Sequence, residues 1–136
     1  MRSCIVYFVA CSVLVACGKQ TDVSTPDITE LYIADFTSDA PEQCGPEDVD
    51  LSKSEVLSFF QQAREVEHKT LHDHYNYAPC AIEGTLTFQQ KTCSWQLRAG
   101  ATGHIKCAEQ YRYFACDDCD ELFNKSQDDR REVSTN

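Results

Sequence analysis

Basic residues and long apolar stretches are both scarce in this sequence. Its 136 residues include 12 lysines and arginines against 22 aspartates and glutamates, so the formal net charge is −10. A surface of that sign repels phosphate backbones and anionic lipid head groups, which disfavours nucleic acid as a partner. The longest apolar or small stretch, Cys4 to Cys17, has 14 residues, whereas a membrane-spanning helix needs about 20. The composition therefore favours neither a nucleic-acid-binding nor a membrane-spanning protein.

Recognisable catalytic and cofactor-binding motifs are also missing. The sequence has no Gly-rich phosphate loop, no G-x-S-x-G elbow and no H-E-x-x-H motif, and no paired carboxylates stand out. It contains one C-x-x-C and no second pair at the spacing of a tetrahedral zinc site. We therefore expect no catalytic residue, no cofactor and no metal, and favour a non-enzymatic role.

The N-terminus has the anatomy of a signal peptide, with Arg2 followed by an apolar run and small residues. The segment Leu14-Val15-Ala16-Cys17, followed by Gly18, resembles the lipobox of bacterial lipoproteins. That resemblance implies that residues 1–16 are removed and that Cys17 is acylated, and several acyl chains anchor a protein stably without a spanning helix. In Gram-negative members an aspartate after the cysteine tends to mark inner-membrane retention, so Gly18 implies the outer membrane, with the protein facing the periplasm.

Cleavage at this position would divide the nine cysteines. Cys4 and Cys11 would leave with the signal peptide and Cys17 would carry lipid, while the mature chain would keep 11 basic and all 22 acidic residues, a net charge of −11. An even number of cysteines in a small exported domain predicts disulfides. The six candidates are Cys44, Cys80, Cys93, Cys107, Cys116 and Cys119.

Residues 28–124 are expected to form one small α+β domain, between a lipidated tether (17–27) and a charged, disordered tail (125–136). Residues 28–36 suit a strand and a short helix equally well. Ser52 and Glu55 form a capping box, so we predict an amphipathic helix that begins at Ser52 and ends before residues 76–79. Glu67 lies within the apolar stripe of that helix, a conflict that fraying near the helix end would relieve.

From Cys80 onward the apolar period changes to two, which predicts an antiparallel meander of about four strands. The predicted fold is thus one amphipathic helix packed on a small sheet and stapled by disulfides. The turn near Gly100 sets Cys93 and Cys107 opposite or diagonal on neighbouring strands, at a separation that suits a disulfide. We rank this pair first, and the other pairings stay open.

Cys116 and Cys119 form the C-x-x-C, which admits a redox interpretation. A helix N-terminus lowers a thiol pKa, but four nearby carboxylates oppose a thiolate, those of Asp117, Asp118, Asp120 and Glu121. The motif also follows a meander, whereas thioredoxin-like motifs lie near a βαβ unit. We therefore favour a structural disulfide over a redox centre or half of a zinc site.

Two further clusters could bind a ligand. His68 and His72, spaced i and i+4 with Glu65 nearby and His74 beyond, could hold a surface metal, although solvated histidines are a simpler explanation. Tyr111 and Tyr113 alternate away from the apolar face of the last strand, and we expect them to form the binding face if the domain binds a partner.

The domain also resembles small, uncharacterised exported bacterial proteins that share a Pro-Cys strand, a tryptophan on the next strand and a terminal C-x-x-C, here Pro79-Cys80, Trp95 and Cys116 to Cys119. The leading hypothesis is a lipid-anchored binding protein, of inhibitor or immunity type, with another envelope protein as partner. The alternative is a thiol-disulfide oxidoreductase that uses Cys116 and Cys119.

Overall fold

The computed structural model describes residues 26–124. The predicted signal peptide, most of the predicted tether including Cys17, and the predicted tail lie outside these residues. No helix within residues 26–124 is long and apolar enough to cross a membrane. The elements in chain order are β1 (Ile28–Ser38), η1 (Pro46–Asp48), α1 (Lys53–Gln62), β2 (Arg64–Val66), α2 (His68–His74), β3 (Cys80–Phe88), β4 (Lys91–Arg98), β5 (Thr102–Cys107), β6 (Gln110–Ala115) and α3 (Asp120–Phe123).

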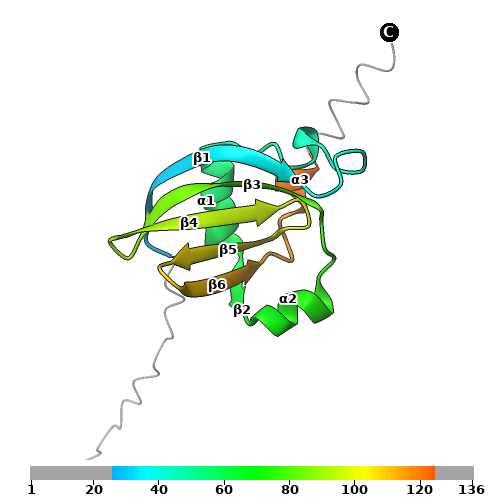
Figure 1. The fold of residues 1–136 in the computed structure, drawn as a ribbon. Helices are drawn as coiled ribbons and strands as arrows, with labels where there is room; N and C mark the ends of the chain where they lie inside the picture. Colours follow the sequence, from blue (N-terminus) through cyan, green and yellow to red (C-terminus); the bar gives the residue numbers. More distant parts are fainter. Residues whose placement is uncertain (1–25, 125–136) are drawn as a thin grey trace, which may run out of the picture.

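The fold is α+β, as expected, but its sheet has six strands instead of about four. All neighbours pair antiparallel, in the order β1-β3-β4-β5-β6-β2 (Figure 1). The meander β3 to β6 corresponds to the four predicted strands. The two added strands lie at the sheet edges, and each pairs with a strand far away in the sequence, which local patterns do not reveal.

Strand β1 resolves the ambiguity of residues 28–36. Its partner is β3, with Ile28 opposite Phe88 and Ser38 opposite Cys80. The two backbones approach closely at Gly84, where a Cβ atom would lie 1.9 Å from the carbonyl oxygen of Tyr32. Only glycine fits this crossing, so Gly84 positions β1 on the sheet.

The single long helix predicted from Ser52 is wrong in its second half. Helix α1 ends at Gln62, the extended strand β2 follows, and a separate helix α2 begins at His68. Strand β2 pairs its backbone with β6, and Arg112 holds Glu65 through two hydrogen bonds of 2.8 and 2.9 Å. Pairing of an otherwise free sheet edge therefore outweighs helix propensity here. Glu67, the residue in conflict, is the N-cap of α2.

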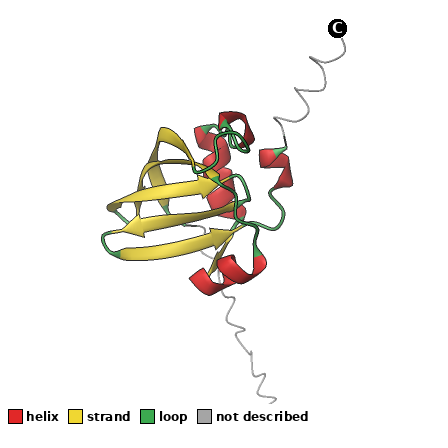
Figure 2. Ribbon diagram, turned by 45° about the vertical axis from the view of Figure 1, so that its right-hand side comes forward, coloured by secondary structure: helices red, strands yellow, loops and turns green. Residues whose placement is uncertain are grey.

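The beginning of α1 follows the capping box predicted from the sequence. Ser52 is the N-cap, its backbone N–H donates to the Glu55 carboxylate at 2.9 Å, and the Glu55 N–H donates to Ser52 Oγ at 3.4 Å. The helix buries Val56, Phe59 and Phe60 against one face of the curved sheet (Figure 2). That face contributes the alternating apolar residues of β3 to β6, including the fully buried Trp95. The opposite face of β4 to β6 is therefore left for other contacts.

All six candidate cysteines are paired in disulfides. Cys44 is bonded to Cys80, Cys93 to Cys107, and Cys116 to Cys119. The Cys93–Cys107 pair is the one favoured by strand register, and its Cα atoms lie 4.5 Å apart on β4 and β5. The other two bonds attach the loop after β1 to β3 and close a short loop before α3, so each staples an irregular segment to the core.

Candidate functional site

The candidate site is an open groove of about 630 Å³ on the face of the sheet that α1 does not cover. The floor of the groove is formed by neighbouring residues of β4, β5 and β6, because Gln96 lies opposite His104 and His104 lies opposite Tyr113. Helix α2, beside β6 in Figure 1, and the segment 75–77 that follows it form one wall. Residues from four separate stretches of the chain thus line one surface.

Tyr111 and Tyr113, the pair predicted to form a binding face, both line this groove. Their rings are nearly parallel, at 7° with centroids 5.8 Å apart, and Tyr111 is 47% exposed. The His104 ring lies 5.3 Å from Tyr111, and the His68 ring lies 4.8 Å from Tyr113. Four rings therefore form a continuous aromatic surface that is reachable from solvent.

No acidic side chain lines the groove, although the chain as a whole is strongly acidic and Glu83 at the margin accepts a hydrogen bond from Gln96 at 3.2 Å. Burial lowers the pKa of His104 below its ordinary value of 6.5, and the nearby Arg98 acts in the same direction. Among the residues that line the groove, Arg98 is the one lysine or arginine. The lining comprises His68, Leu71, His72, Tyr75, Asn76, Tyr77, Gln96, Arg98, Thr102, Gly103, His104, Tyr111 and Tyr113.

A hydrogen-bond network at the edge of the groove holds its wall in place. Arg64 donates to the Tyr75 hydroxyl at 2.7 Å and to Asp117 at 3.2 Å, and the Tyr75 hydroxyl donates to Asp117 at 2.6 Å. The hydrogen bond from Tyr75, followed by that from Arg64, lowers the pKa of Asp117. Because Asp117 lies within the loop closed by Cys116 and Cys119, that disulfide positions one anchor of the groove wall.

The burial of the C-x-x-C cysteines bears on the redox alternative. Cys119 is 1% exposed and Cys116 is 6% exposed. Exchange requires a thiolate to reach one of the two sulfur atoms, so this degree of burial favours the structural interpretation of the pair.

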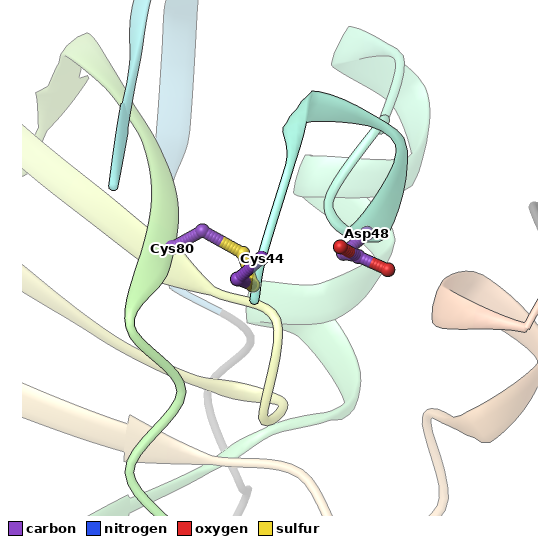
Figure 3. Close-up of side chains that lie close together, drawn as sticks. All are labelled: Cys44, Asp48 and Cys80. Atoms are coloured by element: carbon purple, nitrogen blue, oxygen red, sulfur yellow. A yellow bond between two sulfur atoms is a disulfide. The ribbon is translucent and has the colours of Figure 1, made fainter. Parts of the chain in front are cut away.

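Cysteine, histidine and carboxylate side chains are the groups that could hold a metal ion. Within residues 26–124, the one group of such side chains with ligand atoms close together is Cys44, Asp48 and Cys80 (Figure 3). The two cysteines form a disulfide, and Asp48 accepts a hydrogen bond from the Gly45 backbone at 2.8 Å. This group therefore lacks the thiolates that would bind a metal.

The histidine cluster predicted from the sequence is divided by the break between β2 and α2. His68 and His72 line the groove, whereas Glu65 is held by Arg112 and His74 is outside the lining. His72 contacts the Asp73 carboxylate at 3.1 Å. The structure thus assigns two of these histidines to the wall of the groove.

Sequence reasoning missed Arg98, His104, Tyr75 and Tyr77 as members of the site. For Arg98 and His104 a signal was available, because strict alternation places both on the same sheet face as Tyr113. The two tyrosines follow α2 in an irregular segment, where no periodicity indicates a direction.

Comparisons of the chain with models of protein families, with curated proteins and with solved structures found no match.

Proposed function

We propose that this chain is the precursor of an exported bacterial lipoprotein that is anchored through Cys17 and faces the periplasm from the outer membrane. In this proposal the mature domain is a non-enzymatic binding protein, of inhibitor or immunity type, and the groove receives another envelope protein. The observation that carries the proposal is the lining of the groove, which combines four tyrosines with Arg98 and lacks any acidic side chain.

Two general properties support this role. Tyrosine and arginine are enriched at protein interfaces and also among the residues that dominate binding energy. Three disulfides in the described part of the chain suit an oxidising compartment, where exported proteins reside. Burial of the C-x-x-C cysteines makes the oxidoreductase alternative the weaker candidate.

The anchor is tested by the intact mass of the protein extracted with detergent from the envelope of a Gram-negative host that expresses the full chain. We expect loss of residues 1–16 and the added mass of acyl chains on Cys17. The matched Cys17→Ala variant should keep its N-terminus and lose the lipid. A wild-type mass that retains residues 1–16 without lipid would contradict the proposed anchor.

The binding role is tested by affinity capture from detergent-solubilised envelopes. Replacing Tyr111 and Tyr113 together with alanine should abolish retention of a partner that the wild-type protein retains, because both rings are removed from the groove. Tyr32→Ala is the matched control, since Tyr32 is 58% exposed and lies on β1 outside the groove. The proposal fails if no protein is retained specifically, or if all three proteins retain the same set.

A further inference from the structure

Arg98 differs from the other arginines in the described part of the chain. Arg64 pairs with Asp117 at 3.2 Å and Arg112 pairs with Glu65 at 2.8 Å. Within residues 26–124, no carboxylate lies within ion-pair distance of Arg98. The side chain is only half-buried and lines the groove. A guanidinium in this position is available to a carboxylate supplied from outside.

The contacts of Arg98 hold it in place without neutralising it. One terminal nitrogen donates to the carbonyl oxygen of Ala78 at 2.9 Å, and the guanidinium lies 4.7 Å from the centroid of the Tyr77 ring. A guanidinium has five N–H donors in a planar fork that matches a carboxylate. The donors not used by Ala78 can therefore bind an incoming carboxylate in the groove.

An aromatic surface lies within reach of this charge. Gln96 lies two residues before Arg98 on β4, and the residue opposite Gln96 on β5 is His104, which in turn lies opposite Tyr113 on β6. The spacing of residues along a strand and of strands in a sheet therefore separates the Cα atoms of Arg98 and Tyr113 by about 12 Å. Side chains from both ends shorten that gap. One carboxylate next to one aromatic side chain is therefore enough to contact both.

The openness of the groove favours a segment of a larger partner over a small molecule. Small-ligand sites enclose most of the ligand surface, whereas this groove lies open on the outer face of a sheet. The charge of the lining selects the sign of the segment, because Arg98 is the one lysine or arginine that lines the groove. The carboxylates of Glu83 and Asp39 at its margin each accept a hydrogen bond from a lining residue, Gln96 and Tyr77. An acidic residue of a partner would thus be favoured beside Arg98.

From this juxtaposition we infer that the groove binds a partner segment in which an acidic residue adjoins an aromatic one. The carboxylate binds Arg98, and the aromatic side chain packs on Tyr113 and His104. This inference rests on the proposed binding role of the groove and specifies the chemistry of the partner. Discrimination comes from the carboxylate, because an uncharged amide of the same shape leaves the guanidinium without its counter-charge.

The test is fluorescence anisotropy with the detergent-solubilised mature protein and two short labelled peptides. The peptides differ only in whether aspartate or asparagine precedes a tryptophan. We expect the aspartate peptide to bind at least about tenfold more tightly, the difference that a charged hydrogen-bonded pair typically provides. Arg98→Gln should weaken the aspartate peptide to the level of the asparagine peptide, and Arg98→Lys should restore part of the difference.

Arg112→Gln is the matched control and should preserve the discrimination, because Arg112 is paired with Glu65 and lies outside the groove. Circular dichroism of each variant verifies folding. Equal binding of both peptides would overturn the role of the carboxylate. Binding of free indole-3-acetate as tight as that of the aspartate peptide would overturn the partner segment in favour of a small ligand. If neither peptide binds while capture still depends on Tyr111 and Tyr113, the inference fails and the proposed binding role stands.

Discussion

Replacing Cys44 and Cys80 together with alanine is expected to lower the free energy of unfolding by about 4 kcal/mol. The bond joins residues 36 positions apart, so its removal frees a long loop in the unfolded chain. Cys80 is 0% exposed and begins β3, so the bond also secures the segment after β1 to the core strand. Domains of this size have a total stability of roughly 5–15 kcal/mol, so this loss is a large fraction. Urea unfolding followed by circular dichroism measures it.

The matched control for this prediction is the double alanine variant at Cys116 and Cys119. That bond joins residues only three positions apart, so loop closure predicts a smaller loss of about 2 kcal/mol. Both pairs contain a residue that is at most 1% exposed, which makes the loss of packing comparable. An equal loss from the two variants would show that constraint of the unfolded chain is not what makes the longer bond stabilising.

Phe60→Ala is expected to lower the free energy of unfolding by about 3–5 kcal/mol. Phe60 is 0% exposed, and its ring centroid lies 5.3 Å from Phe114, 5.2 Å from Phe59 and 6.3 Å from Trp95. The side chain thus connects α1 to β4 and β6, and its removal leaves a cavity between layers. Chemical denaturation measures the effect, with Trp95 fluorescence as a second probe of the same contact.

Two further variants make this prediction specific. Phe60→Leu keeps an apolar side chain at the same position and should cost clearly less than alanine. Tyr32→Ala removes an exposed aromatic ring from the same sheet and should change stability by less than about 0.5 kcal/mol. A loss below about 1 kcal/mol for Phe60→Ala would mean that the layers repack without this ring and that the core does not depend on it.

The sequence alone predicted the features that depend on neighbours along the chain. A period of two in residues 80–116 identified the meander and placed Tyr111 and Tyr113 on the face away from the core. A short turn between two of its strands identified Cys93 and Cys107 as partners, and the Ser52 capping box identified the beginning of α1. Each of these signals operates within one element or between adjacent strands, where sequence spacing translates directly into geometry.

Tertiary structure alone decided the features that depend on distant segments. Residues 64–66 continue a helical stripe in sequence, yet they form β2 because β6, some 50 residues away, offers unpaired backbone groups. The same break moves α2 beside the sheet and thereby makes the wall of the groove. Arg98 is set apart only by its surroundings, because its lack of a carboxylate partner among residues 26–124 depends on where every acidic side chain of that region lies. The sequence therefore determined the four strands of the meander and their two faces, whereas long-range pairing added both edge strands and determined which face became a site.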